Sequence, residues 1–147
     1  MFKQWFQKKE QSNINPVSSI KILIIEDSQV DAQMIKKAVE VCGFNSLVAY
    51  DGRTGVAMAK EHKPDLIILD YHLPDINGTQ VLKELRGCKE TALETVMILT
   101  VINGPEAVID TFIQGADQFF KKPISVPFLA KQIQVMLRHP HKDNDSF

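Results

Sequence analysis

The run from Leu66 to Leu69 limits the fold of this chain more than any other feature. Its four residues are branched aliphatics, and the run ends directly on Asp70. A strand without polar alternation is typical of a parallel sheet that helices cover on both faces. Ligands of such sheets bind at the carboxyl ends of the strands, where Asp70 would lie. The alternative is an aspartate that only opens the following turn, and this run alone leaves both interpretations open.

Strand and helix signals alternate along most of the chain. Apolar, β-branched runs predict strands at residues 20–25, 46–50, 66–69, 95–100 and 117–120. Apolar residues at helical spacing, with capping or stop signals, predict helices between Ser28 and Gly43, over 53–62 and 78–86, after Pro105, and over 126–138. This order predicts an α/β fold with a five-stranded parallel sheet, right-handed crossovers and helices on both faces.

The helix after Pro105 has one broad apolar face. Val108, Ile109, Phe112 and Ile113 fall within an arc of about 140° at helical spacing. An arc this broad predicts that the face packs in the core and is not a partner-binding surface.

Size and composition exclude several classes of protein. The 147 residues, 44% of them hydrophobic, suffice for one domain with a core. A formal net charge of -1 gives no electrostatic footprint for nucleic acid. No apolar run approaches the roughly 20 residues that cross a bilayer, and the start lacks a signal-peptide core, so we expect a cytoplasmic protein. Cys42 and Cys88 lack metal-ligand spacing, so we expect reduced thiols.

Residues 1–19 read as an extension in front of the domain. Phe2, Trp5 and Phe6 form one stripe of a short amphipathic segment, and a polar linker interrupted by proline follows. Such a stripe suits a membrane surface or a partner protein. An isolated helix of about ten residues is marginal in water, which favours a frayed or self-docking extension instead.

The domain is predicted to end at residue 138. Residues 139–147 are polar and are predicted to form a disordered tail. His139 and His141 are spaced like a metal-binding pair, but a solvated tail is the simpler interpretation.

The predicted strand ends bring five polar side chains to one edge of the sheet. These are Glu26, Asp27, Asp70, Thr100 and Lys122. Two carboxylates about 4 Å apart repel each other by roughly 4 kcal/mol at an effective dielectric constant near 20. A hard divalent cation offsets that repulsion, and an all-oxygen site with room for water and phosphate favours Mg²⁺.

Such a site can accept a phosphoryl group, because that transfer depends on positioning and charge neutralisation. Asp70 is the predicted acceptor, and Glu26 and Asp27 are the predicted acids that hold the metal with it. Thr100 would donate a hydrogen bond to the phosphoryl oxygens, and Lys122 would pair with their charge.

Four segments in this order resemble the receiver domain of bacterial two-component response regulators. They are Ile22–Asp27, Leu66–Asp70 with Leu73–Gly78, Thr100, and Gly115–Pro123. The resemblance covers about residues 20–138 and implies a flavodoxin-like, doubly wound sheet with strand order 2-1-3-4-5. Since only a polar tail follows residue 138, we expect a stand-alone receiver similar to chemotaxis regulators.

The resemblance also implies how the site works. Asp70 would take the phosphoryl group from a phosphohistidine on a sensor histidine kinase or a histidine phosphotransfer protein, with Mg²⁺ bound. His72 would offer its backbone carbonyl to the metal. Lys122 matches the lysine of the family better than Lys121 does, because it directly precedes Pro123.

The resemblance assigns Thr100 and Phe119 to the pair that reports phosphorylation. The hydroxyl moves toward the phosphoryl group, and the ring turns into the space that it leaves. Tyrosine is frequent at position 119, so an inward Phe119 would gain packing but no hydroxyl hydrogen bond.

Two further positions are predicted to modulate access to the phosphoryl group. Val101 stands where the family usually has a small residue, and its bulk is predicted to hamper water or a phosphatase. His72 lies two positions after the acceptor and either alters hydrolysis or is an exposed loop histidine without such a role.

We expect a phosphoacceptor switch and not an enzyme. Its output would be altered binding of an unknown protein target, through the fourth helix, fifth strand and fifth helix, or relay of the phosphoryl group. A receiver-like scaffold that never carries phosphate, tethered through the N-terminal aromatic stripe, is the alternative that Val101 leaves open. A phosphatase of the haloacid-dehalogenase type is disfavoured. The pattern of that family has a second aspartate two positions after the nucleophile, and this chain has His72 there.

Overall fold

The described part of the chain, residues 19–101 and 104–141 of this computed structural model, alternates strands and helices. Its five strands form one parallel sheet in the order β2-β1-β3-β4-β5, which confirms the predicted doubly wound α/β fold. None of the helices in these two ranges is long and apolar enough to cross a membrane. The elements are β1 (Lys21–Ile25), α2 (Gln29–Val41), β2 (Asn45–Ala49), α3 (Gly52–His62), β3 (Leu66–Leu69), α4 (Gly78–Gly87), β4 (Val96–Thr100), α5 (Pro105–Ile113), β5 (Gln118–Lys121) and α6 (Val126–Arg138).

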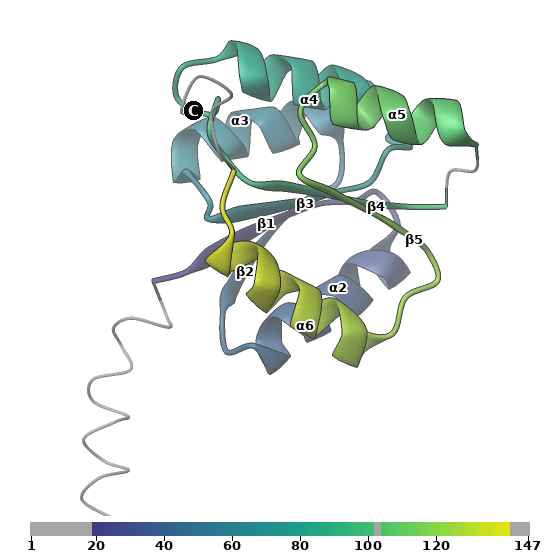
Figure 1. Cartoon of the computed structure of the whole chain (residues 1–147). Coiled ribbons are helices and arrows are strands. Elements are labelled where there is room, and N and C mark those ends of the chain that lie inside the picture. Colours follow the sequence, from purple (N-terminus) through teal and green to yellow (C-terminus); the bar gives the residue numbers. More distant parts are fainter. Residues whose placement is uncertain (1–18, 102–103, 142–147) are drawn as a thin grey trace, which may run out of the picture.

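Helices cover both faces of the sheet, with α3, α4 and α5 on one face and α2 and α6 on the other (Figure 1). Leu23 and Ile25 of β1 pack in the core beneath α3 and α4, whereas Ile22 and Ile24 pack against α2 and α6. Alternate residues of one strand therefore enter two separate cores. The run Leu66–Leu69 is apolar at every position for the same reason, since all four residues are buried.

Two sets of hydrogen bonds fix the second half of the loop between β3 and α4. The carboxylate of Asp75 accepts the N–H groups of Gly52 and Arg53, at 2.8 and 2.9 Å, at the positive end of α3. Partial desolvation raises the pKa of Asp75, but the backbone N–H groups outweigh it and lower the pKa to about 2. At the end of the loop, Asn77 and Gln80 form a capping box that begins α4.

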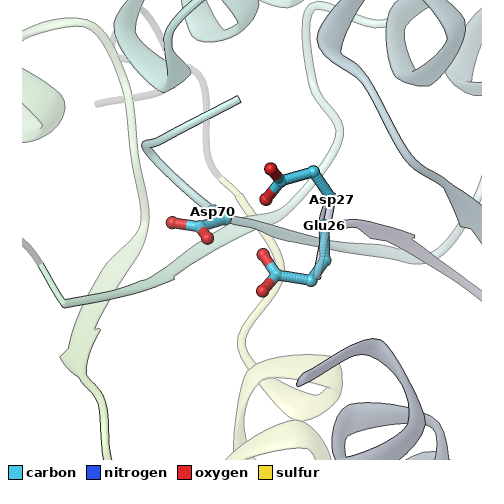
Figure 2. Close-up of side chains that lie close together, drawn as sticks. All are labelled: Glu26, Asp27 and Asp70. Carbon is cyan, nitrogen blue, oxygen red and sulfur yellow. The ribbon is translucent and has the colours of Figure 1, made fainter. Parts of the chain in front are cut away.

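Parallel pairing of β1 and β3 brings their carboxyl ends to the same edge of the sheet. Ile25 pairs with Leu69, and the N–H of Asp70 donates to the carbonyl of Ile25 at 3.0 Å. Glu26 and Asp27, which follow β1, therefore lie beside Asp70, which follows β3 (Figure 2).

The apolar face of α5 does not pack in the core, so that prediction is wrong. The helix turns Thr111 inward, and Asp110 accepts a hydrogen bond from the Thr79 hydroxyl of α4 at 3.0 Å. Helical spacing reveals an apolar stripe but not which side of the helix faces the sheet, and here polar contacts decide the orientation. The exposed residues of the face are Ile109 (56%), Phe112 (44%) and Ile113 (73%).

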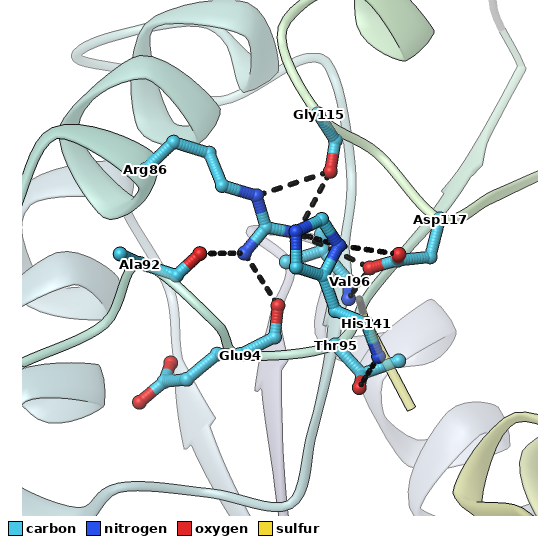
Figure 3. Close-up of polar contacts among 8 residues, drawn as sticks. All are labelled: Arg86, Ala92, Glu94, Thr95, Val96, Gly115, Asp117 and His141. Atoms are coloured by element: carbon cyan, nitrogen blue, oxygen red, sulfur yellow. Dashed lines mark hydrogen bonds and ion pairs between the residues drawn. The ribbon is translucent and has the colours of Figure 1, made fainter. Parts of the chain in front are cut away.

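The segment after α6 starts as ordered structure and not as the predicted disordered tail. The backbone N–H of His141 donates to Thr95 Oγ1 at 2.9 Å, and its ring Nδ1 lies 2.6 Å from Asp117 Oδ1 (Figure 3). The prediction is therefore wrong for residues 139–141, because polar groups before β4 and β5 provide partners that a local pattern does not reveal. Residues 142–147 lie outside the described residues, as do residues 1–18 with their predicted amphipathic segment.

Candidate functional site

Three carboxylates meet at the edge of the sheet shown in Figure 2. One oxygen from each of Glu26, Asp27 and Asp70 lies within 4.8 Å of the others. Glu26 and Asp70 are buried and Asp27 is exposed, so the site opens to solvent on one side. Glu26 Oε2 is buried without a hydrogen-bond partner among the residues that the structure describes. An all-oxygen set with one unsatisfied buried acceptor and one open side fits a hard cation such as Mg²⁺, which keeps water ligands.

Glu26 and Asp70 form a coupled pair of carboxyl groups. Burial, reinforced by the neighbouring Asp70, raises the pKa of Glu26 to about 9 against the opposing charge of Lys122. Burial also raises the pKa of Asp70, but Glu26, the hydroxyl of Thr100, the charge of Lys122 and the N–H of His72 outweigh it and hold the pKa below its usual value. The two shifts have opposite directions, so Asp70 is the carboxyl of this pair that favours the ionised form. The ionised carboxylate is the form that acts as a nucleophile.

Lys122 brings a positive charge into this group of acids. Its Nζ lies 2.7 Å from Glu26 Oε1, 2.8 Å from Asp31 Oδ2 and 3.2 Å from Asp70 Oδ2. Burial lowers the pKa of Lys122, but the three carboxylates outweigh it and raise the pKa above its usual value, so the ammonium stays charged. Lys121, the other candidate, is exposed at the end of β5.

Asp31 is a residue of this site that sequence reasoning missed. It lies in the first turn of α2, where the N-cap hydroxyl of Ser28 accepts the N–H of Asp31 at 3.3 Å. An acid in a first helical turn is explained by the helix dipole alone, so no local pattern points to a distant partner for it. The available signal was position, because a helix that starts directly after β1 places its first turn at the same edge of the sheet as Glu26 and Asp27.

Thr100 and Phe119 come from the neighbouring strands β4 and β5. Thr100 ends β4 and is fully buried. Within residues 19–101 and 104–141 its hydroxyl makes no hydrogen bond of normal geometry, but it lies close enough to Asp70 to help lower the pKa of that carboxyl, and so it faces a group that enters the site. Phe119 pairs with Ile98 in the register and packs, partly buried, on the core beneath α3 and α4.

His72 and Val101 are both exposed near the acceptor. The backbone N–H of His72 donates to Asp70 Oδ1 at 3.2 Å, and its ring lies edge-on to the ring of Tyr71 with centroids 5.3 Å apart. Val101 is 57% exposed and borders a hollow of about 430 Å³ beside Lys122. The rest of the lining is mostly apolar and comprises Val30, Asp31, Met34, Pro123 and Ile124.

Comparison with known proteins agrees with the observed fold. The chain matches the model of the response regulator receiver domain over residues 22–134. The polar-differentiation response regulator DivK of Brucella anthropi is 30% identical over 118 residues, which are 79% of this chain and 94% of DivK. The probable transcriptional regulatory protein TcrX of Mycobacterium tuberculosis is 32% identical over 119 residues, which are 81% of this chain and 50% of TcrX.

A solved structure shows the same fold at similar identity. The chemotaxis protein CheY4 of Vibrio cholerae superposes with a TM-score of 0.74 and 28% identity, covering 79% of this chain and 97% of CheY4. The chain thus spans about half the length of TcrX and nearly all of DivK and CheY4. The match over residues 22–134, together with the strand order, confirms the resemblance, and the chain belongs to the family of response regulator receiver domains.

Proposed function

We propose that this receiver domain is a phosphorylation switch in which Asp70 accepts a phosphoryl group from a phosphohistidine. The donor would be a sensor histidine kinase or a histidine phosphotransfer protein. One observation carries the proposal: the carboxylate of Asp70 lies 3.2 Å from the Lys122 ammonium and is grouped with Glu26 and Asp27. Those two acids would hold Mg²⁺ together with Asp70, and the backbone carbonyl of His72 is predicted to join them.

In the proposed reaction an oxygen of Asp70 forms the new P–O bond. The P–N bond of the phosphohistidine breaks, and its electron pair returns to the imidazole nitrogen. Bound Mg²⁺ would neutralise negative charge on the carboxylates and the phosphoryl oxygens. Lys122 would pair with one phosphoryl oxygen, and the buried hydroxyl of Thr100 would donate a hydrogen bond to another.

Phosphorylation would first move the side chain of Thr100 and would finally alter the binding of a protein target. When the Thr100 hydroxyl moves toward the phosphoryl group, Phe119 can turn into the space that it leaves, which is a two-state element biased by local charge. The surface that would read this change consists of α5, β5 and α6. The exposed apolar residues of α5 support this assignment, because a patch of this kind on a small domain marks an interaction site.

A first test measures the acceptor directly. Incubation of the chain with acetyl phosphate and Mg²⁺ is expected to add the mass of one phosphoryl group, and Asp70→Asn is expected to remain unmodified because the amide is not a nucleophile. Intact-mass spectrometry reads the result, and Asp65→Asn, an exposed aspartate on the same chain, serves as the matched control that still gains the adduct. An adduct of equal yield in Asp70→Asn would contradict the assignment.

A second test concerns the predicted shielding by Val101. Because this side chain borders the hollow beside Lys122, Val101→Ala is expected to open a path for water and shorten the lifetime of the phosphorylated form about two- to fivefold. Loss of the adduct with time, followed by intact mass after removal of acetyl phosphate, gives the lifetime. Val135→Ala, which is distant from the site on α6, should leave it unchanged. An unchanged lifetime in Val101→Ala rejects the shielding.

A further inference from the structure

The ammonium of Lys122 has no spare hydrogen. It carries three hydrogens, and three carboxylate oxygens lie within hydrogen-bond distance, from Glu26, Asp31 and Asp70. A phosphoryl oxygen can therefore gain a bond from Lys122 only if one of these three contacts is given up.

The three partners differ in how readily they can return to water. The side chains of Glu26 and Asp70 are only 1% and 9% exposed, so a carboxylate that lost the ammonium there would remain buried. The side chain of Asp31 is 38% exposed, at the start of α2. Release of Asp31 into solvent is thus the least costly of the three.

From this geometry we propose that Asp31 is a positioning residue that holds Lys122 in the unphosphorylated arrangement and opposes addition of the phosphoryl group. The inference rests on the proposed function, since it concerns the same acceptor. Asp31 would oppose phosphoryl binding in two ways. It competes with the phosphoryl oxygens for a hydrogen of Lys122, and its own negative charge, 2.8 Å from that ammonium, repels the anionic group that Lys122 must bind.

The charge of Asp31 has the opposite effect on the binding of Mg²⁺. A nearby carboxylate attracts Mg²⁺ and repels a phosphoryl group. Its removal should therefore weaken the binding of Mg²⁺ and strengthen the binding of the phosphoryl group. A variant that merely loosened the site would weaken both. The pair of affinities therefore separates the proposed role from a structural one.

The test compares the wild type with Asp31→Asn by isothermal titration calorimetry. We expect the affinity for Mg²⁺ alone to fall about two- to threefold and the affinity for beryllofluoride, at saturating Mg²⁺, to rise about three- to tenfold. Glu40→Gln removes the same charge from the exposed far end of α2, and both affinities should stay at the wild-type value. Asp31→Ala, which also removes the carboxylate, should reproduce the two opposite shifts.

An unchanged or weaker affinity for beryllofluoride in both Asp31 variants overturns the inference, provided that the wild type binds it. If the wild type binds Mg²⁺ but neither takes up beryllofluoride nor gains an adduct from acetyl phosphate, the proposed function itself fails. The two failures are distinguished by the wild-type titration.

Discussion

Replacement of Arg86 by methionine is expected to lower the free energy of unfolding by about 3–5 kcal/mol. The Arg86 side chain is 15% exposed and ties three segments together (Figure 3). Its partners precede β4 and β5, whereas the acceptor Asp70 follows β3, so the two sites lie at opposite edges of the parallel sheet. The Arg86 guanidinium donates to the carbonyls of Gly115, Ala92 and Glu94 and pairs with Asp117 at 3.1 Å. Methionine keeps the aliphatic part of the side chain but leaves these acceptors without their donor.

Urea unfolding followed by circular dichroism measures the effect. Arg86→Lys should recover only part of the loss, because a single ammonium cannot reproduce the planar fork that reaches several carbonyls at once. Arg53→Met removes an exposed arginine from α3 and should stay within about 0.5 kcal/mol of the wild type. A loss under about 1 kcal/mol in Arg86→Met would show that water replaces the guanidinium without cost.

The same variant has an expected pH dependence that arises from Glu94. Burial raises the pKa of Glu94 to about 7, and the charge of Arg86 opposes that rise. Since the folded pKa exceeds the unfolded value, Glu94 lowers stability as pH increases from about 4.5 through 7. Loss of Arg86 should raise the folded pKa further and extend this decline to higher pH. The destabilisation of Arg86→Met is therefore expected to be larger at pH 8 than at pH 6.

The convergence of Glu26, Asp70 and Lys122 could be predicted because it follows from backbone order alone. A buried parallel strand places its last residue at one edge of the sheet, whatever the details of packing. Predictions that depended on which way an element turns were less secure. Ile109 and Phe112 lie on a regular apolar stripe, yet the helix turns Thr111 inward, and Asp110 contacts Thr79, which lies 31 residues away in the chain.

The contacts of Asp31 and His141 show the second limit of sequence reasoning. Each residue has a sufficient local explanation, a first-turn acid for Asp31 and a polar tail for His141. Their partners lie 91 and 24 residues away in the chain, on Lys122 and Asp117. Local patterns do not indicate such pairs, because one tertiary contact changes the role of a side chain without changing its neighbours in sequence.

Lys122→Met is expected to remove phosphoryl binding and to destabilise the domain in the absence of metal. The buried carboxylate of Asp70 would lose the ammonium at 3.2 Å, and Glu26 would lose a partner at 2.7 Å. Removing one partner of a buried ion pair costs about 3–5 kcal/mol, and because Glu26 can hold a proton in this pair, we expect the lower part of that range. Affinity for beryllofluoride should fall at least about 100-fold, because no other cation among the described residues contacts Asp70.

Mg²⁺ separates this electrostatic explanation from simple loss of packing. If the carboxylates of Lys122→Met lack a counter-charge, Mg²⁺ should bind the folded variant more tightly than the wild type and restore more of its stability. Urea unfolding with and without Mg²⁺ measures both quantities. Lys121→Met makes the same chemical change at the adjacent, exposed position and should match the wild type throughout. Equal stabilisation of Lys122→Met and wild type by Mg²⁺ would mean that the lysine contributes packing and hydrogen bonds and that its charge does not oppose the metal.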